Sequence, residues 1–274
     1  MTTKTKIKDG LTNLFTWLGL HPNGWSVGNA FKVHEFKELV DRARLQPGAV
    51  VLDLGCGQGL QTQLLARRCA NVVGVDVSSS AIEKAKWRQR FSPVRSRLHY
   101  YCSPLEAAGL PANHFDHVFS FCVLEHIPNL DVVLAELARI VKPGGTMHFT
   151  VDSLGTIHDP ALIERHRKDH SVIEFFTADS IRQRLSSAGF DVTECYPIFT
   201  SARASEEFAK RIVSGGSVSL PEKIRLYREL RREDRRNPSP EGIMVLVRAR
   251  KPLRNVQVGE LPAQQESGRE SAAA

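Results

Sequence analysis

The sequence contains no run of about 18 apolar residues, the length that a membrane-spanning helix requires, and it therefore predicts no integral membrane span. Its first residues are polar and basic, and they lack the small-residue cleavage site of a secretory signal. The five cysteines are odd in number and scattered through predicted strands and helices, which suits a reducing compartment better than a disulfide framework. Together these absences predict a cytoplasmic protein.

The chain is also too short to suggest several domains. Its 274 residues suit a single α/β core with additions. The net charge of +7 lies partly in residues 223–236, where arginines alternate with acidic residues. Mixed charges at helical spacing predict a solvated helix, and a phosphate-rich partner such as a nucleic acid is the alternative.

The stretch 50–59, VVLDLGCGQG, joins an apolar run to a carboxylate and three alternating glycines. It predicts a buried strand that ends in a tight turn, followed by a helix over residues 60–69. Gly55, Gly57 and Gly59 allow the backbone to reach positive φ and allow a ligand to approach the main chain. Strand, turn and helix together are typical of a nucleotide-binding half of a doubly wound fold.

A second apolar strand, residues 71–77, carries Asp76 about 20 residues after the glycines, where a ribose-binding carboxylate is expected. The motif therefore predicts an adenosine cofactor. A dinucleotide site would need a third glycine at Leu60, where it permits close approach to a pyrophosphate. Asp53 precedes the turn, where a carboxylate would repel phosphate but would help to hold an ammonium group. These residues disfavour an NAD-dependent dehydrogenase.

This stretch resembles the first motif of class I S-adenosylmethionine-dependent methyltransferases, which embraces the methionine part of the cofactor. Further motifs stand in the order of the family's type 11 branch: LP at 110–111, FD at 115–116, VLEH at 123–126 and KPGG at 142–145. The resemblance covers residues 46–190. It implies an α/β, doubly wound (Rossmann-like) sheet of seven mostly parallel strands with an antiparallel last strand. It also implies a methyltransferase that uses S-adenosyl-L-methionine as its cofactor.

The resemblance implies the cofactor contacts as well, and strand ends are where such sheets bind ligands. The implied cofactor-binding residues are Asp53, Gly55, Cys56, Gly57, Gly59, Asp76, Val77, Ser103, Leu105, Glu106, Ser120 and Phe121. The family has an acidic residue near the adenine amino group. Counting back from residues 110–111 gives Glu106, counting on from the strand 98–102 gives Ser103, and both alternatives stay open. Cys56 is interpreted as packing in the turn.

Methyl transfer from a sulfonium is an in-line displacement, in which the protein mainly aligns nucleophile, methyl and sulfur. A general base is needed only if the acceptor must lose a proton. The catalytic candidates on the predicted acceptor rim are His126, His158 and His170, together with Asp152. His126 has a structural alternative, in which it orders its own loop through a backbone hydrogen bond.

No metal site is predicted. His166 and His170 are four residues apart and would share a helical face. However, no third ligand has a motif spacing, and neighbouring basic residues would repel a cation.

The domain organisation is predicted from composition and turn signals. Residues 1–45 are predicted as N-terminal helices that form a cap or lid, and the first helix, residues 6–20, has peripheral membrane contact as an alternative. Residues 46–252 form the methyltransferase domain, with a helical insertion at 199–240 before the last strand. Residues 253–274 are predicted to be a disordered tail.

The acceptor is not specified by the motifs. A small molecule, a lipid-linked intermediate or a sugar, methylated on O, N or C, is the favoured class. RNA or another nucleic acid is the alternative, but the predicted strand 117–122 lacks the Asn/Asp-Pro-Pro-aromatic run of amino-group nucleobase methyltransferases. Cys122 also lacks the preceding proline of cytosine-C5 enzymes. A non-catalytic cofactor-binding scaffold is the third hypothesis, and no oligomeric state is indicated.

Overall fold

The computed structural model of the protein describes residues 22–214, 219–236 and 238–253. The predicted helix over residues 6–20 and nearly all of the predicted tail lie outside the described residues. Among the helices within them, none combines the length and the apolar character that a bilayer crossing needs.

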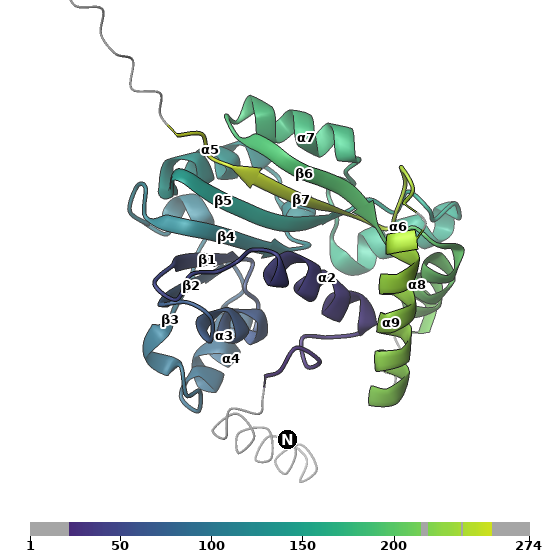
Figure 1. The fold of residues 1–274 in the computed structure, drawn as a ribbon, viewed down its shortest axis with the longest axis horizontal. Helices are drawn as coiled ribbons and strands as arrows, with labels where there is room; N and C mark the ends of the chain where they lie inside the picture. The colour runs from purple at the N-terminus through teal and green to yellow at the C-terminus, as the bar shows by residue number, and fades with distance from the viewer. Residues whose placement is uncertain (1–21, 215–218, 237, 254–274) are drawn as a thin grey trace, which may run out of the picture.

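A seven-stranded sheet forms the centre of the fold, in the order β3-β2-β1-β4-β5-β7-β6 (Figure 1). The strands are β1 (Val50–Leu54), β2 (Asn71–Asp76), β3 (Leu98–Cys102), β4 (Phe115–Phe121), β5 (Val141–Asp152), β6 (Asp191–Ile198) and β7 (Met244–Arg250). The first five pair in parallel, whereas β7 lies between β5 and β6 and is antiparallel to both. The predicted doubly wound sheet with an antiparallel last strand is confirmed.

Helices cover both faces of this sheet, so its central strands are apolar on both sides. The helices are α2 (Ala30–Asp41), α3 (Leu60–Ala66), α4 (Ser79–Gln89), α5 (Leu130–Ile140), α6 (Pro160–His170), α7 (Ala178–Ser187), α8 (Ala202–Ser214) and α9 (Leu220–Arg236). One core cluster joins the sheet to α2, α3, α4, α8 and α9, and a second joins it to α5 and α7. The sheet thus separates two apolar layers, as Figure 1 shows.

The strand β5 includes the KPGG motif. Residues 142–145 have the proline and glycines of a turn signal, yet β5 begins at Val141 and contains them. Val141 pairs with Phe115 across an irregularity in the β4 ladder, and Lys251 exchanges backbone hydrogen bonds with Gly144 and Gly145. Pairing on both sides therefore holds the turn in the sheet.

Helix α2 positions the site because it lies against β4, β5 and α9. Its N-cap is Asn29, whose side chain accepts a hydrogen bond from the Lys32 amide at 3.1 Å, as is typical of helix starts. Helices α8 and α9 are inserted between β6 and β7 and stand beside α2 (Figure 1). The amide of Ile243 donates to the Ile198 carbonyl at 3.1 Å and closes the base of this insertion.

Candidate active site

Two cavities meet beyond the carboxyl ends of the parallel strands. The first, here called the rim cavity, has a volume of 520 Å³ and is lined by the loops that follow β1, β2, β3 and β4. The second, the helix cavity, has a volume of 720 Å³ and is lined by residues of α2, α6 and α8 and by the ends of β4, β5 and β7. His126 lines both cavities. The two therefore adjoin at the loop after β4.

The glycine turn after β1 leaves no room for a side chain at Gly55 or at Gly59. Gly55 has φ +71°, and a Cβ placed there would lie 2.7 Å from Cγ1 of Val123. At Gly59, where φ is +77°, a Cβ would lie 2.5 Å from the Tyr100 hydroxyl. The turn is tied to β2, because the amide of Gly55 donates to the Val75 carbonyl at 2.8 Å. The backbone of the turn thus forms one wall of the rim cavity.

Asp76 lies at the end of β2 and lines the rim cavity. Its Oδ2 accepts a hydrogen bond from the Gly57 amide and its Oδ1 accepts one from the Ser78 amide, both at 2.8 Å. Each carboxylate oxygen has a second acceptor site. The side chain is therefore fixed in place and can still accept hydrogen bonds from a ribose.

Asp53 is buried beneath the glycine turn. Its Oδ2 accepts a hydrogen bond from the Thr62 hydroxyl at 2.6 Å, whereas its buried Oδ1 has no partner among the described residues. Burial raises the pKa of Asp53 to about 7, and the hydrogen bond from Thr62 offsets this only in part. The partnerless Oδ1 of Asp53 is a buried hydrogen-bond acceptor. A cationic group of a ligand bound above the turn would suit this acceptor.

The predicted cofactor residues fall into three groups. Gly55, Asp76, Val77, Ser103, Leu105 and Glu106 line the rim cavity. Neither adenine alternative is excluded, although the Ser103 hydroxyl donates to the Pro104 carbonyl at 2.9 Å. Asp53, Cys56, Gly57, Gly59 and Ser120 do not line either of the two cavities. The Ser120 hydroxyl instead donates to the Leu54 carbonyl at 3.1 Å and ties β4 to β1. Phe121 lines the helix cavity.

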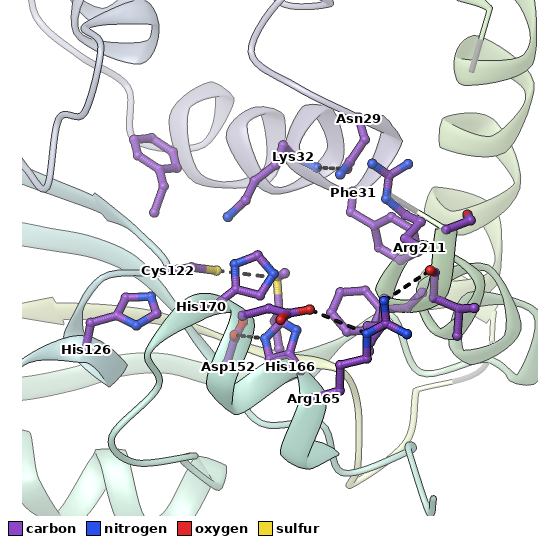
Figure 2. A pocket seen from close by; sticks show the side chains of 17 residues that line it. Asn29, Phe31, Lys32, Cys122, His126, Asp152, Arg165, His166, His170 and Arg211 are labelled. Atoms are coloured by element: carbon purple, nitrogen blue, oxygen red, sulfur yellow. Dashed lines mark hydrogen bonds and ion pairs between the residues drawn. The ribbon is translucent and has the colours of Figure 1, made fainter. Parts of the chain in front are cut away.

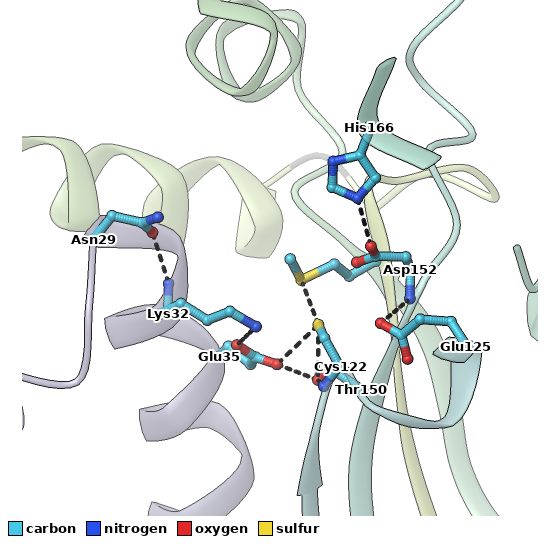
Figure 3. Close-up of polar contacts among 9 residues, drawn as sticks. Asn29, Lys32, Glu35, Cys122, Glu125, Thr150, Asp152 and His166 are labelled. Atoms are coloured by element: carbon cyan, nitrogen blue, oxygen red, sulfur yellow. Dashed lines mark hydrogen bonds and ion pairs between the residues drawn. The ribbon is translucent and has the colours of Figure 1, made fainter. Parts of the chain in front are cut away.

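Figure 3 shows a buried polar cluster, of which Lys32, Cys122 and Asp152 line the helix cavity. Glu35 of α2 is fully buried, and its carboxylate lies 2.9 Å from the Lys32 ammonium. It accepts hydrogen bonds from the Thr150 hydroxyl and from the Cys122 thiol, the latter at 3.2 Å. Burial and the nearby Glu35 raise the pKa of Cys122 well above its ordinary value, so this thiol is not a ready nucleophile.

Cys122 also has an unusual backbone. Its φ is +54°, a conformation that is uncommon outside glycine. The Cys122 amide donates to the carbonyl of Thr150 at 3.2 Å, so the end of β4 remains tied to β5 while the chain turns. Uncommon backbone conformations of this kind cluster at ligand sites, and this one lies where the two cavities adjoin.

Asp152 and His166 form a buried pair in the helix cavity. Oδ2 of Asp152 lies 2.7 Å from Nε2 of His166, and both side chains are buried. Burial by itself would raise the pKa of Asp152, but the hydrogen bond and charge of His166 outweigh burial and hold it below its ordinary value. The Nδ1 of His166 has no hydrogen-bond partner in the described part of the chain. The ionised carboxylate thus orients an imidazole that still has a free nitrogen.

Glu125, in the loop after β4, is also fully buried. Its Oε1 accepts a hydrogen bond from the Asp152 amide at 3.3 Å. Burial, together with the nearby Asp152 carboxylate, raises the pKa of Glu125 to about 8. At neutral pH this side chain is mainly a neutral acid.

The three predicted catalytic histidines are not all brought together. Nδ1 of His126 lies 3.3 Å from the Ser171 carbonyl and donates to it, so His126 both orders its loop and lines the two cavities. His170 lines the helix cavity, with its ring 4.5 Å from that of His166. His158 is exposed and lines neither cavity.

The partner of Asp152 was missed by sequence reasoning, which considered His166 only as a metal ligand with His170. The usable signal was positional. Asp152 ends a central parallel strand, where ligands bind, and His166 lies on the helix that follows. Glu35 gave no such signal, since its charge falls inside an apolar helical pattern.

Cys122, Glu125 and Asp152 could supply ligand atoms to a metal, because these atoms lie within 4.8 Å of one another. The donor set fits a cation poorly. The pKa values of Cys122 and Glu125 are raised by burial, so both hold protons at neutral pH, whereas metal ligands must be deprotonated. A positive charge is also close by. The Lys32 ammonium is paired with Glu35, and the same carboxylate accepts the hydrogen bond from the Cys122 thiol.

Comparison with known proteins finds similarity to methyltransferases. Residues 52–149 match a family model described as a methyltransferase domain. The ubiquinone biosynthesis O-methyltransferase of Hahella chejuensis is 35% identical over 132 residues, which are 46% of this chain and 55% of the relative. The enzyme of that name from Aromatoleum aromaticum is 28% identical over 185 residues, which are 62% and 78% of the two chains. The chain spans about half the length of the first curated relatives it matches.

A solved structure shares the fold. Geranyl diphosphate C-methyltransferase from Streptomyces coelicolor A3(2), solved with Mg²⁺, geranyl diphosphate and S-adenosyl-L-homocysteine, has a TM-score of 0.60 at 12% identity. The match covers 80% of this chain and 78% of that one. The motifs and the strand order agree with these similarities: residues 52–149 match a methyltransferase domain, and the cofactor is S-adenosyl-L-methionine.

Proposed function

We propose that this chain is an enzyme that transfers a methyl group from S-adenosylmethionine to an O, N or C nucleophile of a small molecule held in the helix cavity. The observation that carries the proposal is the junction of the two cavities at His126. The cofactor motif lines one of them, and the other opens on the opposite side of this junction. The volume of 720 Å³ is that of a small-molecule site.

In this proposal the rim cavity holds the adenosine part of the cofactor, with Asp76 on the ribose and Ser103 or Glu106 near the adenine. The glycine turn receives the methionine part, and the partnerless Oδ1 of Asp53 supports a place for its ammonium group. When bound, the cofactor supplies an electrophilic methyl group. The chain itself contributes alignment, which is the main protein term in such transfers.

The proton acceptor that we propose for a hydroxyl nucleophile is His166. Asp152 is ionised and accepts the hydrogen bond from Nε2 of His166, and Nδ1, which is buried and has no partner among the described residues, is the nitrogen that would take up a proton. In this role His166 would take up at Nδ1 the proton that the hydroxyl loses, and the bound cofactor would supply the methyl group. The curated relatives are named O-methyltransferases, which supports oxygen as the nucleophile. His126 and His170 remain the other candidates.

A nucleic-acid acceptor is less well supported. The protonated Cys122 thiol is hydrogen-bonded to Glu35 and is unsuited to the covalent attack that cytosine-C5 methylation requires. Peripheral membrane contact through residues 6–20 concerns a segment outside the described residues. The cytoplasmic location is also a proposal, supported by five free cysteines of the kind found in reducing compartments.

The proposed function is tested with labelled S-adenosylmethionine. Purified protein is incubated separately with a small-molecule extract and with total RNA, and the transferred label is counted. Label in the small-molecule arm alone is the expected result. Label in RNA would show that the acceptor is a nucleic acid and not a small molecule. No transfer to either, despite tight binding of S-adenosylhomocysteine, would favour the scaffold alternative.

A further inference from the structure

The helix cavity is chemically different at its two ends. At one end His126 and Cys122 adjoin the rim cavity. At the other end lie Arg165 of α6 and Arg211 of α8. Figure 2 shows His126 and the two arginines on opposite sides of the cavity, with the Asp152–His166 pair between them. A molecule that fills the cavity therefore meets the methyl-transfer end and a basic end at the same time.

Apolar side chains line much of the cavity near the basic end. They include Phe31 of α2 and Phe208 of α8, whose rings pack edge to face with centroids 5.6 Å apart. Phe121 and Met244 line the cavity from the ends of β4 and β7. Surfaces of this kind favour an apolar ligand body, because burying it removes apolar area from water.

The two arginines differ in how they are held. Arg165 donates to the Val213 carbonyl at 3.2 Å and lies 3.5 Å from the Asp169 carboxylate, so its charge is partly neutralised. Arg211 is half-buried and has neither a hydrogen bond nor an ion pair with any residue that the structure describes. Burial lowers the pKa of Arg211, and the charge of Glu207, one turn away on the same helix, offsets this only in part.

The remaining charges of the cavity are already paired. The Lys32 ammonium lies 2.9 Å from Glu35, and the Asp152 carboxylate is bonded to His166. Arg211 is thus the one cavity cation without a polar partner among the described residues. A guanidinium in this position binds carboxylate or phosphate oxygens by charge-assisted, often bidentate hydrogen bonds.

We propose that the methyl acceptor is an anionic amphiphile. Its carboxylate or phosphate group is bound by Arg211, its apolar body packs against Phe31 and Phe208, and its nucleophile lies at the His126 end of the helix cavity. This inference rests on the proposed function, since it describes the acceptor of the same site. It explains why a cavity with apolar walls ends at a half-buried cation.

Calorimetry on protein saturated with S-adenosylhomocysteine tests the inference. The probes are octanoate, octyl phosphate and the neutral octanamide, which share an apolar chain and differ in the head group. We expect at least one anionic probe to bind about tenfold or more tightly than octanamide, as loss of a charged hydrogen bond would predict. Arg211→Gln should abolish this difference, and Arg211→Lys should restore part of it. Preference for one anion identifies the head group as carboxylate or phosphate.

The matched control is Arg225→Gln, which removes the same charge from an exposed position on α9 that does not line the helix cavity. It should bind the probes as the unsubstituted chain does. Equal binding of anionic and neutral probes, no binding of any probe, or unchanged selectivity in Arg211→Gln would overturn the inference. Failure to bind S-adenosylhomocysteine in the preceding titration would instead count against the proposed function.

Discussion

The rim cavity and the helix cavity are built in different ways. The rim cavity is lined by residues between Leu54 and Val133, in loops that follow successive strands. The helix cavity takes its lining from positions as far apart as Asn29 and Met244. The first is therefore specified by local motifs, because backbone turns at strand ends form its walls. The second depends on tertiary packing, because each helix or strand contributes only a few side chains.

The two cavities also differ in charge. Asp76 and Glu106 line the rim cavity, and Asp53 lies beneath its glycine turn. The acids of the helix cavity are paired, whereas Arg211 has no ion pair among the described residues. This contrast suits a cationic cofactor on one side and an anionic acceptor on the other. Variants that affect one cavity should therefore leave the other intact, and the following predictions test that separation.

The largest effect is expected from His166→Gln. If His166 takes the hydroxyl proton, methyl transfer should fall by roughly 10²–10⁴-fold, while calorimetry with S-adenosylhomocysteine should give unchanged affinity. His99→Gln, at an exposed position on β3, is the control. A parallel loss of cofactor affinity would contradict the separation.

The next effect concerns the glycine turn. Gly55→Ala should strain the positive φ and overlap Val123, costing about 2–6 kcal/mol of unfolding free energy and most of the cofactor affinity. Gly57→Ala is a matched control, since its φ is +51° but a Cβ there meets nothing within 4 Å. It should cost about 1–3 kcal/mol. Urea unfolding of both variants measures the difference, and equal losses would show that the contact with Val123 is unimportant.

Asp76→Ala should weaken binding of S-adenosylhomocysteine by about 1.5–3 kcal/mol, because it removes a charged hydrogen-bond partner of the ribose. Octanoate binding in the helix cavity should not change. Asp191→Ala, at the exposed start of β6, controls for loss of a carboxylate. Calorimetry with both ligands decides the matter. Tight NAD binding by the unsubstituted chain would contradict the assignment of this cavity.

The smallest predicted effect is a pH dependence from Asp53. Its pKa of about 7 means that the carboxylate ionises between pH 6 and 8. If the ionised form holds the ammonium group, affinity for S-adenosylhomocysteine should rise by about tenfold at most over this range. The Asp53→Asn variant should show no such rise. An equal pH dependence in the variant would assign the titration to another group.

The stability of the cofactor-free chain should change in the opposite direction. Because folding raises the pKa of Asp53 above its ordinary value of 3.8, the folded chain holds a proton that the unfolded chain has released. The contribution of this group to the free energy of unfolding is therefore fully present below pH 4, falls as pH rises towards 7 and then levels off. Urea unfolding of the unsubstituted chain and of Asp53→Asn at several pH values between about 4 and 8 would measure this loss of stability.

The fold could be predicted from sequence where periodicity and glycine placement act locally. The strands β1, β2 and β3 begin at the predicted residues, because apolar runs bounded by turn signals leave few alternatives. The end of β4 was harder. Ser120 and Phe121 were both assigned to the cofactor, yet successive side chains point to opposite faces of a strand. Ser120 is therefore buried against β1, and Phe121 lines the helix cavity.

The polar contacts of the helix cavity could not be predicted, because they join residues far apart in the chain. Glu35 and Thr150 are 115 positions apart. His158 was expected at the rim because it follows β5, but after Asp152 the chain next lines the cavity on α6, at Arg165 and His166. Arg211 lay in a segment predicted to be helical, and nothing in its periodicity indicates which side chains face the cavity.

The closure of the α8–α9 insertion has a consequence for how such enzymes diversify. The insertion leaves the sheet at Ile198 and returns at Ile243, and these two residues are hydrogen-bonded to each other. A Cβ on the adjacent Gly242 would overlap the Ile198 carbonyl, so the crossing point admits only glycine. Everything between these residues can therefore be exchanged or lengthened without altering the register of β6 and β7. A chimera that takes this segment from a homologue should still bind S-adenosylmethionine, because the rim cavity is unchanged. Its helix cavity would have a different lining and should accept a different substrate.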